Sequence, residues 1–552
     1  MTRLRPIAAA LAACVSVAVL SAQRATPPAP SRPSTIPQQP TPPRLLVLLV
    51  VDQFRADYAE LYGSQWTQGL KRIFAEGASF PLAAMPFGVT KTCAGHSSIS
   101  SGTVPAVHGM IDNEWYDIGT HEYVACTADP SAISLPFGGE RGSEHHSPRW
   151  LQTSTLADEL RRQATQPPTI VALALKARSA VSLAGHGGAN TIVAWEEDSG
   201  TWATSSAFTR TPWPQVEAYV RGHPTRASRG AVWNRLLPLA SYLFDDRAPG
   251  EINSSVFPRR IDAPLGGSFS AVWDASPWSD AYLGDLAVTL TRSLGLGKEG
   301  RTDMLAVSFT ALDYVGHNFG PRSHEVQDTL ARLDGTIGQL LTALDTQVGR
   351  DHYVLALTSD HGVAPLPEQG AATGVPGGRV SVASLGRAVE LALSAELGRG
   401  SYVEAIASPY IYFHPQVVDR IRSSPKAMAT VGKIVQAVPG IDKLYWAAEL
   451  AAKSPTADPI LSSLRRSYFA GRSGDVVFVT KPYWVVADIG TNHGSPRDYD
   501  TRVPLVLFGA SIKPGRYAVA ATPVDIVPTL ASLSGVAMPR TDGRVLSEAI
   551  AK

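Results

Sequence analysis

The chain has 552 residues, and 44% of them are hydrophobic, which is enough to bury a large core without fixing how many domains form. Its formal net charge is +1, and no run of Lys or Arg is long enough to cover a phosphate backbone. We therefore do not expect nucleic acid as its main partner.

The first 22 residues have the layout of a secretory signal peptide. Arg3 and Arg5 precede an apolar run that ends in small residues near Ala22. The segment around Cys14 can also be read as a lipoprotein cleavage site, but apolar residues continue beyond it to Leu20. We expect a periplasmic or secreted protein, with a lipid anchor at Cys14 as the lesser alternative.

Residues 23–43 are predicted to be an extended linker, because a segment dense in Pro, Ser, Thr and Gln cannot form a core. The folded domain is expected to cover residues 44–552. No later stretch has the ~18 uninterrupted apolar residues that a membrane span requires, so we expect no stable span. The sequence leaves the oligomeric state open, and a monomer is the favoured expectation.

Three continuous apolar runs of strand length are followed by acidic residues. Leu45–Val51 leads to Asp52, the run from Met304 leads to Asp313, and the run from Tyr353 leads to Asp360 and His361. Such runs are typical of strands that are covered on both faces. In open α/β sheets, sites form beyond the carboxyl ends of the strands, which is where these side chains are expected to lie.

Apolar residues between the second and third runs recur at steps of three and four, which predicts an amphipathic helix over residues 323–345. A strand, a helix and a second strand indicate a parallel pair. Residues 503–509 resemble a further strand, and residues 523–535 resemble a closing helix. The predicted fold class is therefore α/β, with a mostly parallel central sheet.

Two regions, about 195–280 and 365–485, break this alternation. The first contains six of the eleven Trp residues, many Pro residues and no clear period, and the second is similarly irregular. We interpret both as insertions that cap the site. Elaborated loops are an equally weighted alternative.

Short stretches far apart in the chain together supply three carboxylates and three imidazoles. They are Asp52, Asp313, His317, Asp360, His361 and His493. Hard cations prefer oxygen-only shells, whereas zinc accepts a mixture of imidazole and carboxylate. Each residue alone is a weak signal, although Asp313 and His317 are four apart and can share one face of a helical turn. The whole set predicts two adjacent zinc ions, a centre suited to hydrolysis at phosphorus.

Between Pro86 and Asp117, a Thr-rich turn runs into a helix of small residues, and His493 lies in the segment TNHG. With these segments the chain resembles the alkaline phosphatase superfamily, and within it the secreted bacterial alkaline phosphatases that use threonine as nucleophile. These are relatives of the nucleotide pyrophosphatase/phosphodiesterases. The resemblance extends over nearly the whole chain after the linker, and it implies an α/β/α sandwich of the alkaline phosphatase type.

The resemblance implies catalytic roles for four residues. The nucleophile stands just before the short helix, which selects Thr92 over Thr90. Asn113 is implied to donate to a phosphoryl oxygen, and Lys176 with Arg178 to hold the dianionic oxygens of a monoester. Lys176 and Arg178 follow a strand-like run two residues apart, so we expect both to point to one face of an extended chain.

Plainer interpretations compete with these roles. A threonine at this place is commonly a helix N-cap, and a Lys-x-Arg pair after a strand is commonly a solvated basic pair. His96, inside the same helix as the small residues, is expected to orient the turn rather than to bind metal.

The resemblance also divides the ligands between two zinc ions. Asp313, His317 and His493 would hold the first ion, and Asp52, Asp360 and His361 would hold the second, which activates Thr92. A phosphothreonine intermediate should form and then be hydrolysed.

The predicted function is zinc-dependent hydrolysis of small-molecule phosphate monoesters, with broad specificity and weaker phosphodiesterase activity. One alternative is a nucleotide pyrophosphatase/phosphodiesterase of the same superfamily. Another, of a different class, is a secreted zinc- or ligand-binding protein whose catalytic machinery has decayed. A sulfatase would need a Cys-x-Pro-x-Arg pattern, which the residues after Cys93 do not provide.

Two cysteines, Cys93 and Cys126, remain if Cys14 leaves with the signal peptide. An oxidising compartment favours a disulfide between them, and two buried free thiols are the alternative.

Overall fold

The computed structural model describes residues 42–138, 142, 144–197, 200–252, 256–262, 268–372 and 374–551. The predicted signal peptide with Cys14, and the predicted linker up to residue 41, lie outside the described residues. No helix within the described ranges is long and apolar enough to cross a membrane.

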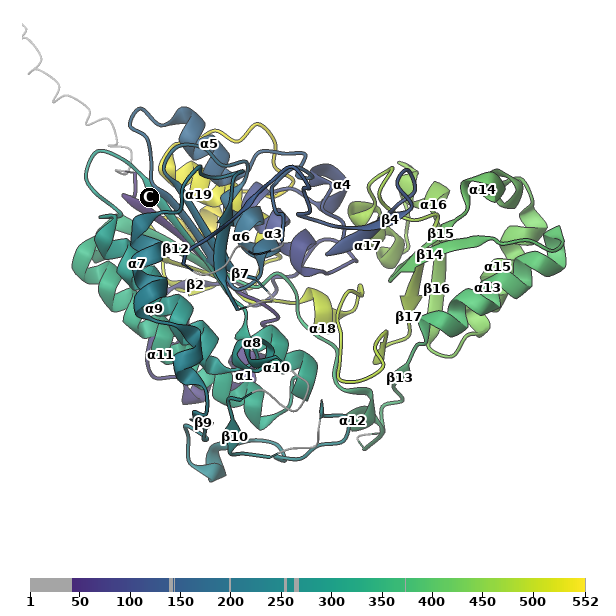
Figure 1. Cartoon of the computed structure of the whole chain (residues 1–552), viewed down its shortest axis with the longest axis horizontal. Coiled ribbons are helices and arrows are strands. Elements are labelled where there is room, and N and C mark those ends of the chain that lie inside the picture. Colours follow the sequence, from purple (N-terminus) through teal and green to yellow (C-terminus); the bar gives the residue numbers. More distant parts are fainter. Residues whose placement is uncertain are drawn as a thin grey trace, which may run out of the picture. The chain divides into compact units, whose positions relative to one another are not determined.

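A ten-stranded sheet forms the centre of the fold (Figure 1). Its strands, in spatial order, are β20 (Gly515–Arg516), β2 (Ala78–Ser79), β19 (Leu505–Gly509), β12 (Tyr353–Thr358), β1 (Leu45–Val51), β11 (Asp303–Phe309), β6 (Ile170–Ala174), β7 (Thr191–Glu196), β8 (Trp202–Ser205) and β5 (Ser134–Pro136). The five strands from β12 to β7 run parallel, whereas β19 and β8 join them antiparallel. The predicted α/β fold is confirmed, with the parallel strands in the middle of the sheet.

The strand order corrects one detail of the prediction. Helix α11 (His324–Gln347) connects β11 to β12, close to the predicted bounds, but these two strands are not neighbours. β1 lies between them and is parallel to both, with Val51 opposite Phe309 and Val50 opposite Thr358. The carboxyl ends of all three strands therefore lie level with one another.

Both faces of the sheet are covered, which explains why β1 is apolar throughout. Its odd-numbered residues pack with α2 (Gly69–Glu76), α9 (Pro277–Ser293), α10 (Ala311–Phe319) and α11. Its even-numbered residues pack with α3 (Thr92–Ser101), α5 (Leu156–Gln163), α6 (Ala177–Ala184) and α19 (Ile526–Ser534). Successive strand residues point to opposite faces, so one strand contributes to two layers of core.

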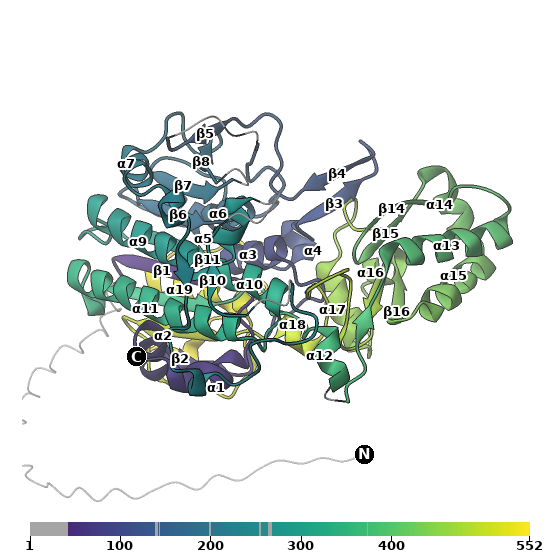
Figure 2. The ribbon, with the colours of Figure 1, turned by 60° about the horizontal axis from the view of Figure 1, so that its bottom comes forward.

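Residues 378–485 contain a second, smaller sheet. At the two ends of this region, the short strands β13 (Gly378–Arg379) and β18 (Trp484–Val485) pair with each other. Its antiparallel strands, in order, are β14 (Val403–Ala407), β15 (Tyr410–Phe413), β17 (Val476–Thr480) and β16 (Ile441–Trp446). The helices on one of its faces are α13 (Val382–Leu397), α14 (Pro415–Arg422) and α15 (Pro425–Ala437), and Figure 2 shows α13 and α15 side by side. The other face packs Tyr410 and Tyr412 near Trp115, in a cluster that also contains Cys93.

The first irregular region begins inside the main sheet, because β7 and β8 are two of its strands. Beyond them, its elements are α7 (Pro214–Gly222), the pair β9 (Val232–Trp233) and β10 (Arg259–Arg260), α8 (Phe269–Asp274) and the start of α9. That either region caps the site remains a prediction.

Candidate metal centre and active site

The carboxyl ends of four adjacent parallel strands carry the candidate site. Asp52 follows β1, Asp313 lies in α10 just after β11, Asp360 follows β12 and Lys176 follows β6. Because these strands are neighbours and run in the same direction, residues that are hundreds of positions apart in the sequence meet at one edge of the sheet.

The structure brings all six predicted ligands together. Two groups have ligand atoms that all lie within 4.8 Å of one another: Asp313, His317 and His493 form one, and Asp52, Asp313 and His361 form the other. The first is the predicted group. In the second, Asp313 stands where the resemblance implies Asp360, whose Oδ2 lies 3.3 Å from His361 Nε2. Asp313 is thus shared between the groups.

The three imidazoles are anchored in the same way. In His317, the ring Nδ1 lies 2.7 Å from the carbonyl oxygen of Thr491. In His493, Nδ1 lies 2.8 Å from the carbonyl oxygen of Thr90. In His361, Nδ1 lies 3.0 Å from the carbonyl oxygen of Gly362. A carbonyl oxygen can only accept, so Nδ1 carries the proton in each neutral ring and Nε2 keeps its lone pair. All three Nε2 atoms face the acidic residues. Metal-ligating histidines are typically held by such a bond on the other ring nitrogen.

Burial keeps two of these rings neutral. It lowers the pKa of His361 to about 4. Burial, followed by the neighbouring rings of His361 and His317, also holds the pKa of His493 well below its ordinary value. The rings of His361 and His493 stack with their centroids 3.5 Å apart. Both can therefore offer a nitrogen lone pair near pH 7.

Two of the three carboxylates share one buried cation. Lys176 Nζ lies 2.7 Å from Asp52 Oδ2 and 2.5 Å from Asp313 Oδ2. Burial lowers the pKa of Lys176, but Asp313 and Asp52 outweigh it and hold that pKa above its ordinary value. Burial likewise raises the pKa of Asp313, yet Lys176 and His317 outweigh it and the carboxyl stays ionised.

Negative charge remains in excess at the site. Burial, then Asp313 and Asp360, raise the pKa of Asp52 well above its ordinary value. Asp52 Oδ1 and Asp360 Oδ2 are buried and have no hydrogen-bond partner among the described residues. Buried carboxyl oxygens need a hydrogen-bond donor or a cation, and zinc accepts carboxylate oxygens together with imidazole nitrogens. The residues present therefore fit zinc.

The predicted geometry of Lys176 and Arg178 is wrong. β6 ends at Ala174 and α6 begins at Ala177, so Lys176 precedes a helix and Arg178 lies in its first turn. Leu175 and Ala177, which follow the strand, have high helix propensity. The extended segment therefore ends sooner than the apolar run in the sequence indicated. Arg178 makes no ion pair with any described carboxylate, and its buried Nε has no hydrogen-bond partner there.

Thr92 is the first residue of α3, and the N-cap position before it is occupied by Lys91. Thr92 is therefore not the N-cap of this helix. Thr92 is buried, and its Oγ1 lies 3.4 Å from His361 Nε2. The hydroxyl that was predicted to be the nucleophile is therefore beside a predicted metal ligand.

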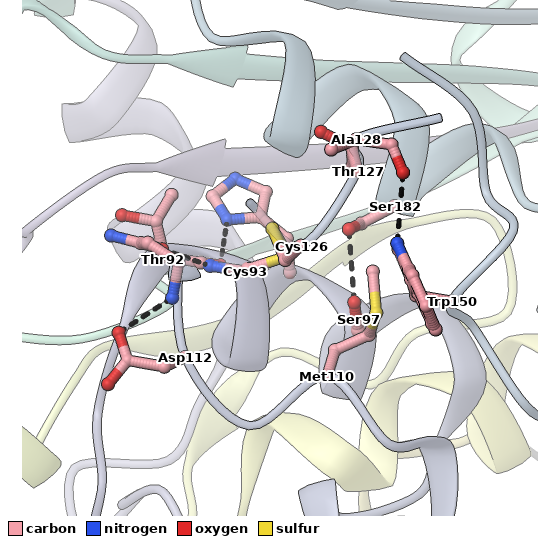
Figure 3. Close-up of a disulfide and its surroundings, with 12 residues drawn as sticks. Thr92, Cys93, Ser97, Met110, Asp112, Cys126, Thr127, Ala128, Trp150 and Ser182 are labelled. Carbon is pink, nitrogen blue, oxygen red and sulfur yellow. Dashed lines mark hydrogen bonds between the residues drawn. A yellow bond between two sulfur atoms is a disulfide. The ribbon is translucent and has the colours of Figure 1, made fainter. Parts of the chain in front are cut away.

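The residue after Thr92 is Cys93, which is bonded to Cys126 (Figure 3) and also contacts Asn113. Cys93 N donates to Asn113 Oδ1 at 2.9 Å, and Cys126 N donates to the Asn113 carbonyl oxygen at 2.9 Å. A disulfide joins Cys93 to Cys126, whose Cα atoms are 6.7 Å apart. With its oxygen held by α3, the Asn113 side chain has its NH2 group left for another acceptor.

Two further polar side chains belong to the site. His96 was expected to orient the turn, and its Nδ1 lies 2.9 Å from the Thr92 carbonyl oxygen and 3.2 Å from Asp360 Oδ2. The second is Gln53, which follows Asp52 in the sequence, and its Nε2 donates to Asp313 Oδ1 at 2.6 Å. Its place next to Asp52 was the only signal that the sequence offered.

Several relatives that match this chain over nearly its whole length are alkaline phosphatases. PhoV, an alkaline phosphatase of Synechococcus elongatus, is 29% identical over 97% of this chain and 98% of its own. PhoK, an alkaline phosphatase of a Sphingomonas species, is 30% identical over 92% of this chain and 91% of its own. The crystal structure of the alkaline phosphatase PafA matches with a TM-score of 0.84 and 28% identity, covering 92% of this chain and 99% of that one.

A family model described as type I phosphodiesterase / nucleotide pyrophosphatase matches residues 46–500. That range includes every predicted ligand and the four predicted catalytic residues. The chain belongs to this family, and within it resembles the bacterial alkaline phosphatases.

Proposed function

We propose that this protein hydrolyses phosphate monoesters at a two-zinc site through a phosphothreonine intermediate on Thr92, with broad specificity and weaker diesterase activity. Phosphoester hydrolysis is the reaction class of its alkaline phosphatase relatives. The observation that carries the finer proposal is the position of the buried Thr92 hydroxyl, 3.4 Å from His361 Nε2 in a largely buried cluster of three imidazoles and three carboxylates.

The ligand sets are assigned from this cluster. Asp313, His317 and His493 would hold one ion, and Asp52, Asp360, His361 and the Thr92 oxygen would hold the other, with Asp313 within reach of both. When bound, two zinc ions supply Lewis-acid stabilisation to the entering and departing oxygens and favour an ionised hydroxyl.

The protein's own residues orient the reaction. Thr92 Oγ1 forms the new bond to phosphorus while the ester oxygen leaves with its alcohol, and water later cleaves the phosphothreonine. Asn113, held by Cys93 N, would donate its NH2 group to a phosphoryl oxygen. A crystallised variant of PafA carries changes at one threonine, one asparagine, one lysine and one arginine, the residue types of Thr92, Asn113, Lys176 and Arg178.

Arg178 is proposed to select monoesters over diesters, because a monoester dianion offers it a second charged oxygen. Arg178→Ala should lower kcat/KM for an aryl monoester by about 10- to 100-fold, since a hydrogen bond to a charged group contributes about 1.5–3 kcal/mol. Diester turnover should change far less. Arg178 suits this test better than Lys176, whose removal would also leave Asp52 and Asp313 without their cation. Equal losses for both substrates would contradict the assignment.

The proposal is tested by comparing rates on an aryl phosphate monoester and the matching diester, with and without a chelator, alongside metal analysis. Chelator-sensitive hydrolysis that favours the monoester is expected. Faster diester cleavage would instead support a nucleotide pyrophosphatase/phosphodiesterase. Bound zinc without turnover of either ester would support a decayed binding protein.

Export to the periplasm or the medium is also proposed. The disulfide between Cys93 and Cys126 supports it, because such bonds persist in oxidising compartments.

A further inference from the structure

We infer that Gln53 is a positioning residue that joins the two ion groups and sets how tightly they bind zinc. The inference rests on the proposed two-zinc centre. Gln53 follows Asp52 directly and is completely buried.

One residue reaches all three carboxylates of the site. The backbone N–H of Gln53 donates to Asp360 Oδ1 at 3.3 Å, and its side-chain Nε2 donates to Asp313 Oδ1 at 2.6 Å. Its own peptide bond attaches it to Asp52. The relative placement of the three acids therefore depends on the conformation of this single residue.

The orientation of the Gln53 carboxamide is fixed by chemistry. An ionised carboxylate can only accept, so the amide nitrogen must face Asp313. The carboxamide oxygen, Oε1, is consequently left buried without a hydrogen-bond partner among the described residues. An unsatisfied buried acceptor destabilises the folded state, so the bond to Asp313 is retained at the expense of folding stability.

The backbone of Gln53 is also in an unfavourable conformation. Its φ of 68° lies in the left-handed region, which is unfavourable for a residue with a Cβ atom. Such conformations persist where the surrounding structure requires them. Here the left-handed turn directs the N–H toward Asp360 while the side chain turns toward Asp313.

A second element makes room for this side chain. Gly316 lies in α10 between the ligands Asp313 and His317, and a Cβ atom at Gly316 would stand 1.8 Å from Gln53 Oε1. Glycine inside a helix is destabilising relative to alanine. Helix α10, which carries two of the ligands, therefore has a helix-destabilising glycine at the position where the Gln53 carboxamide needs space.

A carboxylate oxygen has two lone pairs, so Asp313 Oδ1 can accept from Gln53 and still face an ion. Outer hydrogen bonds of this kind typically change metal affinity by about 10- to 100-fold when they are removed. Gln53 would hold Asp313 in the orientation that serves both groups.

The test measures zinc affinity by competition with a chromogenic chelator, together with the melting temperature of the metal-free protein. Gln53→Met keeps the length of the side chain but removes the donor, and it should weaken zinc binding by about 10- to 100-fold. Gly316→Ala should produce the same loss by displacing the carboxamide, and the double variant should lose little more than either single one. Gly432→Ala, in the middle of α15 with no atom within 4 Å of the added Cβ, is the matched control and should keep wild-type affinity.

The metal-free Gln53→Met protein should melt within a few degrees of wild type, which a residue needed only for folding would not do. Unchanged zinc affinity in both Gln53→Met and Gly316→Ala would overturn the inference while leaving the proposed function intact. A wild-type protein that binds no zinc would overturn the proposed function, and this inference with it.

Discussion

Thr92→Ala is expected to reduce kcat for an aryl phosphate monoester by ~10³-fold or more and to abolish the phosphoenzyme, because the variant lacks the only proposed nucleophile. The Thr92 hydroxyl is buried beside His361, at the first turn of α3. The phosphoenzyme is measured by rapid acid quench and mass spectrometry of the peptide that contains residue 92. Thr92→Ser retains a hydroxyl and should keep part of the activity.

Thr90→Ala is the matched control for this experiment. Thr90 lies on the same turn, but its hydroxyl donates to the Ser495 carbonyl oxygen at 3.2 Å. Its own carbonyl oxygen, which accepts from His493, is preserved by the substitution. Thr90→Ala should therefore keep its phosphoenzyme burst. A burst that survives in Thr92→Ala and disappears in Thr90→Ala would transfer the nucleophile to the other threonine.

The central sheet could be predicted because the local sequence of its strands is a recognisable apolar run. Leu45–Val51 is apolar at every position, since each of its residues enters one of two cores, and the acidic residue after it lies at the strand end where sites form. The same reasoning located Asp313 and Asp360. The four-residue spacing of Asp313 and His317 was sufficient to predict a shared helical face, and both lie in α10.

The order of the strands could not be predicted in this way. Nothing local in the segments around β11 and β12 indicates that β1 separates them, because strand order follows from the packing of the whole sheet. The second sheet has the same difficulty. Its strands are short and lie among helices, so its region showed no single period.

Contacts between distant side chains were also beyond the sequence. Lys176 bonds to acids that lie 124 and 137 positions away. These bonds give it a different environment from the solvated basic pair of the plainer interpretation. Gln53 is similar, because its left-handed backbone and its bond to Asp313 across 260 positions leave no trace in composition or periodicity.

Asp313→Asn is expected to remove both zinc ions, whereas His317→Ala should remove one. Asp313 belongs to both candidate groups, and His317 belongs to only one of them. Asparagine preserves the size of the side chain but removes its charge and one of its two acceptor oxygens. An ion at such a site contributes several kcal/mol to transition-state stabilisation, so kcat/KM should fall by ~10³-fold or more. Zinc content is measured by elemental analysis after dialysis against metal-free buffer.

Asp280→Asn is the control, because Asp280 is a buried acid that caps the same helix. Its Oδ1 accepts from Thr310 N at 2.9 Å and from Ala311 N at 3.1 Å, and an asparagine oxygen can accept both bonds. Burial raises the pKa of Asp280 to about 7, so its carboxyl is only partly ionised near neutral pH and the substitution removes less than a full charge. Zinc content should stay at the wild-type level. If Asp313→Asn instead lost a single ion, Asp313 would serve one group alone, and Asp52, Asp360, His361 and Thr92 would hold the second ion without it.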